Sequence, residues 1–293
     1  MAIREFIPIG LKASDIDDKL RFEGPLRSAI IMSLKPMLYG FWSSSSGVES
    51  KQLEFFSQGV NLGRITGEVK EAISLGADHF TIWSPKETEL TVLNLKQRYW
   101  ELSKILRQSR KGKFHFNRRE VTHLSAAYYC PRKIYVVVVA TEDYLNIFPM
   151  DLHLKNPESN AYALGLQVTN LATAKIEESQ QLLVCELDTT QLSTAYSLGK
   201  NHGKTNLHGA KLPYEFSPSH HYGLPVPDFA IGYREIQIEQ SKHLGSHMLF
   251  LGRVVNEVLP DQAVVQPYHI HRFYYDWLSR KGLLSPSMKL KVS

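Results

Sequence analysis

The stretch from Tyr128 to His153 constrains the fold of this chain more than any other part of the sequence. It begins with an apolar run, continues through a polar turn, and ends in a second run that opens Asn-Ile-Phe-Pro-Met-Asp. Runs of this kind, bounded by turn residues, are typical of buried β-strands. Asn146 and Asp151 lie where the interior of a strand is normally apolar. Because an unpaired buried polar group costs about 1–3 kcal/mol, such side chains require either a ligand or an internal network.

The bulk composition indicates a folded chain with a sizeable core. The 293 residues allow one large domain or two ordinary ones, and the content is 43% hydrophobic and 22% charged. No apolar run reaches the roughly 18 residues that span a bilayer, and the N-terminus shows no secretory signal. Both cysteines, Cys130 and Cys185, lie in apolar strand-like runs, which favours buried free thiols. We therefore expect a cytoplasmic protein that does not enter a membrane.

The net charge of +5 is compatible with an anionic ligand such as a phosphate. The densest basic cluster has no aromatic platform beyond Phe114 and Phe116, so we interpret it as a solvated helix end and linker and expect no nucleic-acid binding. The cluster consists of Arg107, Arg110, Lys111, Lys113, Arg118 and Arg119.

Residues 1–112 read as a small α/β region. A strand pattern runs from Ser28 to Trp42 with a break at Pro36, and a second strand is predicted over Phe80–Trp83.

Two helices are predicted in the same region. Thr66 is expected to cap a short helix that stops at Gly76. A second helix is expected to start at Ser84, because Pro85 follows and Glu87 lies three residues on. The apolar stripe of this second helix is Leu95, Tyr99, Leu102 and Leu106.

From about residue 113 strand-like runs dominate, so we divide the chain into an N-terminal region, 1–112, and a C-terminal domain, 113–293. Several short strands separated by turns suggest a closed barrel, which removes exposed strand edges. Helices are predicted after Thr173 and near Ala195–Gly199. The predicted strands are Lys133–Thr141, Ala163–Thr169, Gln181–Leu187, Tyr233–Gln240, His247–Leu259 and Ala263–Gln266.

Five segments of the C-terminal domain together resemble the flavin reductase-like, FMN-binding split-barrel family. In order they are PRKIYVVVVATEDYLNIFPMDLH, YALGLQVTNLATAKIEESQQLLVCEL, AYSLGKNHGK, REIQIEQ and LGSHMLFLGRVVNEV. Their order and spacing cover roughly residues 115–275, whereas residues 1–112 carry no resemblance.

This resemblance implies a mainly β fold, a six-stranded Greek-key split barrel preceded by the small α/β region. It also implies a homodimer with FMN near the subunit interface, and hydride transfer from NAD(P)H to the flavin. The flavin performs that chemistry while the protein aligns the rings, so no catalytic side chain is expected. Reduced flavin would then serve an oxygenase or another electron-acceptor protein.

The resemblance also places the cofactor-binding residues. Phosphate-side candidates precede or open a helix, whose N-terminal N–H groups suit an anion. They are Thr169, Asn170 and Thr173. The segment that approaches the ring is Asn146, Ile147, Phe148 and Pro149, and the further candidates are Lys200, His202, His247 and Gln167.

Two positions depart from the family pattern. Gln167 stands where close relatives often have Arg or Ser, and Asp143 precedes the Asn146 segment where the family often has Gly. These departures keep a second hypothesis open, in which the barrel is a non-catalytic ligand-binding or dimerisation module without bound flavin.

Other chemistries have little support in the sequence. His220 and His221 are adjacent, and His269 and His271 lie two apart, a spacing that places both side chains on one side of a strand, as a metal site could use. No Asp, Glu or Cys accompanies them as a set, so no metal is expected. The Gly-x-Ser-x-Gly elbow of serine hydrolases is also absent.

Overall fold

A computed structural model describes residues 6–11, 22–23, 30–43, 52–57, 60–91, 93–110, 115–127, 132–202, 205–260 and 264–282. The chain forms two compact units. The first unit combines Met1–Arg132 with Tyr268–Lys291, and the barrel unit is Lys133–Pro267. None of the helices in the described ranges is long and apolar enough to cross a membrane.

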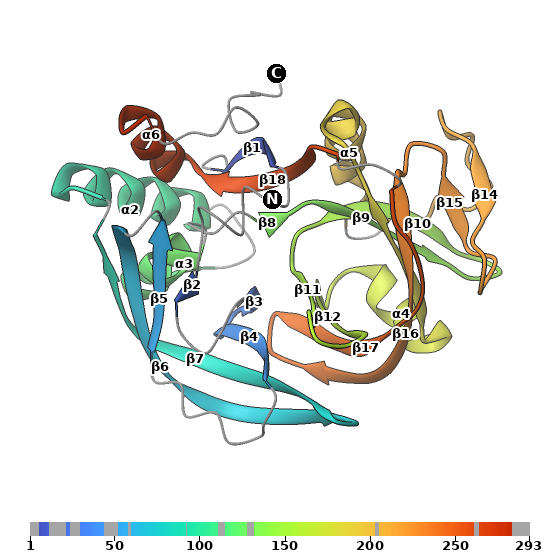
Figure 1. Cartoon of the computed structure of the whole chain (residues 1–293), viewed down its shortest axis with the longest axis horizontal. Coiled ribbons are helices and arrows are strands. Elements are labelled where there is room, and N and C mark those ends of the chain that lie inside the picture. The colour runs from blue at the N-terminus through green and yellow to red at the C-terminus, as the bar shows by residue number, and fades with distance from the viewer. Residues whose placement is uncertain are drawn as a thin grey trace. The chain divides into compact units, whose positions relative to one another are not determined.

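The first unit contains a six-stranded antiparallel sheet with the order β2-β5-β6-β7-β4-β3 (Figure 1). Its largest fully buried side chains include Tyr39, Phe41, Phe80 and Trp83, and the Tyr39 and Trp83 rings meet edge to face at 5.9 Å. The strands are β2 (Phe22–Glu23), β3 (Ile30–Leu34), β4 (Met37–Ser43), β5 (Gln52–Ser57), β6 (Val60–Leu75) and β7 (Asp78–Leu90).

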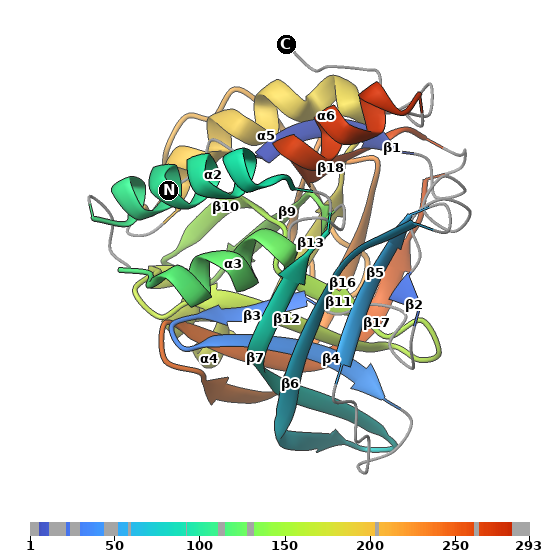
Figure 2. The same ribbon diagram turned by 90° about the vertical axis from the view of Figure 1, so that its left-hand side faces the viewer.

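Helices α2 (Leu95–Arg110) and α3 (Arg118–Ala127) follow this sheet in sequence, and α3 packs on β7, β6 and β4 (Figure 2). The backbone carbonyl of His123 on α3 accepts the Tyr39 hydroxyl at 2.8 Å. The His123 ring lies 2.6 Å from the Thr88 hydroxyl, and burial lowers its pKa to about 4. Near the end of the chain, β18 (Gln266–His271) pairs with β1 (Phe6–Leu11) and β8 (Arg132–Lys133), and α6 (Arg272–Arg280) contacts β1.

One helix prediction in this unit is wrong, and a second is wrong in where the helix begins. The predicted stripe of Leu95, Tyr99, Leu102 and Leu106 lies on α2, which begins at Leu95 and not at Ser84. The residues from Thr66 to Leu75 belong to β6, and Gly76 takes a φ of +62° in the β6–β7 turn. Ser84–Glu87 lie inside β7, where Pro85 is tolerated because the β6 register shifts between Thr66 and Gly67. Long-range pairing of the two strands therefore overrides the local helix signals. From Ile30 onward the Ser28–Trp42 prediction is confirmed as the hairpin of β3 and β4, whereas Ser28 lies outside the described residues. The Phe80–Trp83 strand lies in β7.

The barrel unit is a curled antiparallel sheet of seven strands with the order β10-β9-β13-β16-β17-β12-β11. Its ends, β10 and β11, are consecutive in sequence and are joined only by Asp151 and Leu152. Such a link spans at most about 11 Å, so the two edges of the sheet must lie close together. The mainly β, split-barrel prediction is therefore confirmed, with the short β11 as the seventh strand.

The elements of this unit agree with most strand predictions. Helix α4 begins two residues before the predicted Thr173, and α5 with the following η2 covers the predicted 195–199 region. The sheet strands are β9 (Tyr135–Ala140), β10 (Leu145–Met150), β11 (His153–Lys155), β12 (Ala161–Gln167), β13 (Gln181–Glu186), β16 (Gly232–His243) and β17 (His247–Val258). The remaining elements are α4 (Leu171–Ser179), η1 (Thr189–Gln191), α5 (Leu192–Leu198), η2 (Gly199–Asn201) and the hairpin of β14 (Phe216–Pro218) and β15 (Pro225–Pro227).

The valine run of β9 is apolar throughout because both faces of the strand are covered. Val137 and Val139 pack in the interior cluster with Phe148 and Phe250, whereas Val136 and Val138 pack outside with residues of α5. The buried thiol of Cys185 is free, as predicted, and Cys130 lies outside the described residues.

Candidate functional site

The predicted ring-side residues lie on β10, and most of them are buried. Asn146, Ile147 and Phe148 have no exposed surface. The Asn146 amide donates to the Tyr144 hydroxyl at 3.2 Å and to the Asn201 carbonyl at 3.1 Å, and its oxygen accepts from the Ile147 N–H at 2.8 Å. The sequence indicated that this side chain requires either a ligand or an internal network. The structure shows an internal network.

The segment that follows α5 runs along the outer edge of β10. It satisfies three alternate carbonyls of that edge strand. Leu207 N–H donates to Leu145 at 2.6 Å, the Asn201 side chain to Ile147 at 2.9 Å, and the His202 ring lies 2.7 Å from the carbonyl of Pro149. Alternate carbonyls point the same way along a strand, so this segment covers the edge of the sheet.

The predicted phosphate-side residues gather where β12 leads into α4. Asn170 caps α4 by accepting from the Ala172 N–H at 3.0 Å. The Thr173 hydroxyl donates to the Gln167 carbonyl at 2.9 Å and is buried. Gln167 in turn pairs with His247, the first residue of β17. The Asn170 and Thr173 side chains thus shape this turn, with Asn170 as the cap of α4.

Three of the predicted residues present their side chains to solvent. Thr169 is exposed immediately before the α4 cap, and Lys200 and His202 are exposed in and after η2. His247, by contrast, is 2% exposed, and burial lowers its pKa to about 4, so its ring is neutral at pH 7.

A pocket of about 370 Å³ adjoins the β9–β10 turn. Its volume is within the range of small-molecule sites. Asn206 holds two of its walls together, because its oxygen accepts from the Leu145 N–H at 3.1 Å and its amide donates to the Asp143 carbonyl at 3.1 Å. The lining residues are Ala140, Thr141, Tyr144, Leu145, His208, Gly223, Leu224 and Pro225. The contributions of residues 206–208 and 223–225 could not be predicted from the sequence, because these residues are distant from the β9–β10 turn along the chain.

A buried ion cluster at one end of the barrel was also missed. Glu186 at the end of β13 accepts from Lys133 at 2.9 Å and from Arg234 at 2.6 Å, and Glu257 pairs with both Arg234 and Lys155. Burial opposes ionisation of Glu186, but Lys133 and Arg234 outweigh it and lower the pKa of this carboxyl. Burial also lowers the pKa of Lys133 to about 8. The cluster joins the ends of β13, β16 and β17.

The described residues contain no group of three or more His, Cys, Asp or Glu side chains placed to hold a metal ion. His220 and His221 instead lie at the β14–β15 hairpin. The His221 N–H donates to the Glu235 carboxylate at 3.0 Å, and the Ser219 hydroxyl donates to the same carboxylate at 2.5 Å.

No protein-family model matches this chain, and no curated protein matches it. Solved structures are similar to about half of it. An FMN-binding protein from Thermus thermophilus, with bound p-hydroxybenzaldehyde, is 20% identical over 46% of this chain and 75% of its own, with a TM-score of 0.40. The NADH:FAD oxidoreductase of Streptomyces globisporus C-1027 is 13% identical over 55% and 95%, with a TM-score of 0.45.

BorF, the flavin reductase component of a bacterial two-component tryptophan halogenase, is 13% identical over 51% of this chain and 96% of its own, with a TM-score of 0.44. The solved structures to which the chain is similar therefore include flavin reductases and FMN-binding proteins, the family that its sequence resembles.

Proposed function

We propose that the barrel unit binds FMN and that the protein is a flavoprotein of flavin reductase type, in which NAD(P)H delivers a hydride to the flavin. One observation carries the proposal. The five segments that resemble the family fall, in order, on β8–β11, β12–α4–β13, α5–η2, β16 and β17, and all of these elements except β8 lie within the barrel unit. Motifs scattered over more than a hundred residues thus belong to a single structural unit.

Different residues would bind the FMN phosphate and position the strands and turns around the cofactor. Thr169 and the positive end of the α4 dipole would receive the phosphate, with Lys200 as a counter-charge. The buried Asn146, Asn170 and Thr173 would act as positioning residues, because their side chains already fix β10 and the α4 turn. When bound, the flavin itself supplies the hydride acceptor.

A specific observation favours the second candidate function, a split-barrel module without flavin. The Asn146, Asn170, Thr173 and Asn201 side chains all make hydrogen bonds within the unit. A barrel that satisfies its own polar groups in this way folds without a cofactor.

An absorption spectrum of protein purified without added cofactor separates the two candidates. Visible flavin bands, or quenching of FMN fluorescence on titration, support the first. NADH or NADPH oxidation with added FMN then tests the hydride transfer. Colourless protein that leaves FMN fluorescence unchanged overturns the first candidate and leaves the second.

A matched pair of variants tests the phosphate position. Thr169→Glu places a negative charge before α4 and should weaken FMN binding by about tenfold or more, because like charges repel. Ser193→Glu adds the same charge to an exposed position of α5 and should leave binding unchanged. Equal FMN affinity in both variants would contradict the phosphate assignment.

A further inference from the structure

Helix α2 of the first unit exposes part of its apolar stripe. Leu95, Tyr99, Leu102 and Leu106 follow helical spacing, which normally turns a helix toward a core. Yet Leu95 is 82% exposed and Tyr99 is 74% exposed, and the neighbouring Trp100 is 45% exposed. Large apolar side chains that gather at the surface mark interaction sites more often than isolated ones do.

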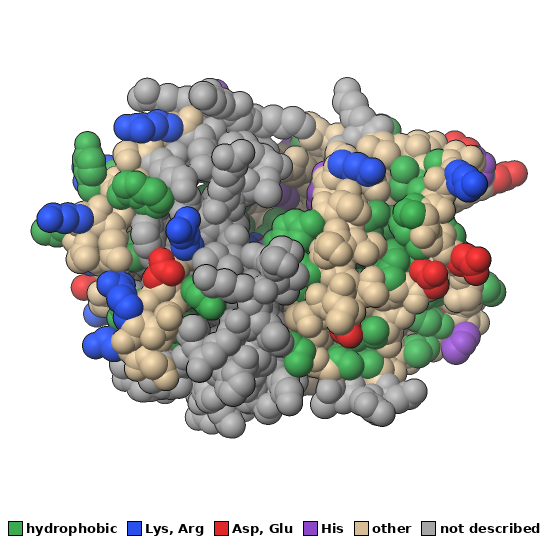
Figure 3. Space-filling model, turned by 90° about the horizontal axis from the view of Figure 1, so that it is seen from above, with side chains coloured by type: hydrophobic (Ala, Val, Ile, Leu, Met, Phe, Trp, Pro, Cys, Tyr) green, Lys and Arg blue, Asp and Glu red, His purple; other side chains and the backbone are tan. Residues whose placement is uncertain are grey.

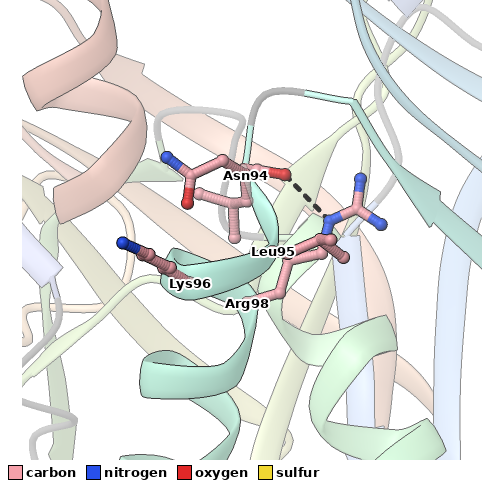
Figure 4. A pocket seen from close by; sticks show the side chains of 5 residues that line it. Asn94, Leu95, Lys96 and Arg98 are labelled. Atoms are coloured by element: carbon pink, nitrogen blue, oxygen red, sulfur yellow. Dashed lines mark hydrogen bonds between the residues drawn. The ribbon is translucent and has the colours of Figure 1, made fainter.

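Leu95, Tyr99 and Leu102 line a groove of about 430 Å³ between α2, α3 and β7, which we call the α2–α3 groove. It adjoins a second hollow at the start of α2, with which it shares Leu95 and Arg98 (Figure 4). Arg98 holds this start in place by donating to the Leu93 carbonyl at 2.8 Å. The groove is lined by Thr88, Leu90, Leu95, Arg98, Tyr99, Leu102, Arg118, Val121, Thr122 and Ser125.

The groove lies in the most basic part of the chain. Residues 95–119 contain nine of the 34 Lys and Arg residues but one of the 29 Asp and Glu residues. Arg118 lines the groove and Lys96 lines the adjoining hollow, where its side chain points away from Arg98 (Figure 4). Lys, Arg and hydrophobic side chains alternate over the helical face of this unit in Figure 3. The surface therefore offers apolar contact and positive charge together.

We propose that the α2–α3 groove docks an acidic amphipathic segment of a partner protein. Leucine or aromatic side chains of the partner would enter the groove beside Leu95 and Tyr99, and its carboxylates would face Lys96 and Arg118. Helix-in-groove recognition uses this combination of apolar anchors and complementary charge. The inference concerns the first unit and stands independently of flavin binding by the barrel.

Charge argues against two other occupants, a second copy of the chain and residues 283–293. A second copy of the chain would bring the same excess of positive charge to this surface, and residues 283–293 contain two lysines and no Asp or Glu. A bilayer surface is too flat to fill a concave groove. The aliphatic lining of Leu90, Leu102 and Val121 suits apolar side chains better than nucleic-acid bases.

Fluorescence anisotropy of the full-length protein with labelled probes tests the proposal. The first probe is an acidic peptide of about 16 residues with Leu and Phe at helical i, i+3, i+4 and i+7 spacing. The second has the same composition in scrambled order, so that only the amphipathic face differs. We expect the first peptide to bind at least about tenfold more tightly than the second.

Paired substitutions test whether the acidic peptide binds in the α2–α3 groove. Leu95→Asp combined with Tyr99→Asp, and Lys96→Glu combined with Arg118→Glu, should each weaken binding by about tenfold or more. Val255→Asp combined with Leu259→Asp changes apolar positions of the barrel unit that are 41% and 56% exposed, and should leave binding unchanged. Lys211→Glu combined with Lys281→Glu is the matched charge control. Circular dichroism verifies that each variant is folded.

Three results would overturn the proposal. The first is equal affinity for the ordered and scrambled peptides, because binding would then depend on charge alone. The second is an unchanged affinity in the folded Leu95→Asp, Tyr99→Asp variant. The third is tighter binding of labelled oligothymidine, or of phosphatidylcholine–phosphatidylserine vesicles, with loss of that binding in the groove variants, which would assign the groove to nucleic acid or to a membrane surface.

Discussion

The Asn146 side chain donates to the backbone carbonyl of Asn201 at 3.1 Å, although the two residues are 55 positions apart in sequence. Asn201 returns a hydrogen bond to the next residue of the same strand, from its amide to the Ile147 carbonyl at 2.9 Å. Both side chains are buried, at 0% and 3% exposure. This exchange fastens the segment after α5 to the edge strand β10.

Asn146→Ala and Asn201→Ala should each destabilise the protein by about 1–3 kcal/mol, because each leaves buried polar groups unpaired. The double variant should lose less than the sum of the two, since both changes break one connection. Urea unfolding of the four proteins measures the coupling. Strict additivity would show that the two residues act separately.

Glu186→Gln should destabilise the barrel unit by about 3 kcal/mol, because it leaves Lys133 and Arg234 as buried cations without their shared carboxylate. The matched control is Asp143→Asn, which breaks the ion pair of Asp143 with Lys175 at 3.0 Å. Asp143 is 73% exposed there, so the expected loss is much smaller than that of Glu186→Gln. Urea midpoints at pH 7 compare the two variants. Similar losses in the two variants would contradict a structural role for the buried cluster.

The buried His247 should make stability depend on pH in mildly acidic solution. Its pKa falls from 6.5 to about 4 on folding, so the unfolded chain binds more protons between these values. Stability from this group is therefore complete above pH 6.5 and falls as the pH drops toward 4, by up to about 3 kcal/mol. His247→Asn should flatten the unfolding free energy over that interval relative to the unaltered protein. An NMR titration in which the His247 ring protonates near pH 6.5 would contradict this account.

Gly67→Ala should destabilise the first unit by about 1–3 kcal/mol through overpacking. A Cβ at this position would lie 2.3 Å from the Ser84 carbonyl oxygen and 2.4 Å from the Trp83 ring, so β6 and β7 would have to separate. Gly199→Ala is the matched control, because its nearest neighbour, Pro149, is 4.0 Å away. Thermal unfolding of the two variants compares them, and an equal change in both would show that close packing at Gly67 is not limiting.

The barrel strands could be predicted from sequence because their apolar runs are long and end in turn residues. The helix starts of the first unit could not, since Ser84–Glu87 fits the same capping pattern as the true starts. The structure places reciprocal caps at Asn94 with Gln97, at 2.9 and 3.1 Å, and at Asn117 with Glu120, at 2.9 and 2.7 Å. Strand pairing with β6 decides between the candidates, and no local pattern contains that information.

Prediction from sequence reaches the same limit at the candidate site, because long-range contacts decide the structure there too. Asn146 was recognised as unusual because an amide in an apolar strand requires a partner. Its partners at Tyr144 and Asn201 depend on the return of the chain after α5, which sequence spacing does not specify. The helix after the turn around Asn170 and Thr173 could be predicted, because the hydrogen bonds of this turn are local.

The first unit is built from two separate parts of the sequence, and this affects how the polypeptide folds during its synthesis. β1 is the earliest strand to be synthesised, and its pairing partner β18 emerges only after the whole barrel unit. Until the chain has been synthesised beyond residue 268, the N-terminal part of the first unit therefore lacks β18 and α6. Nascent chains of this protein would need protection for longer than those in which each domain is completed in turn.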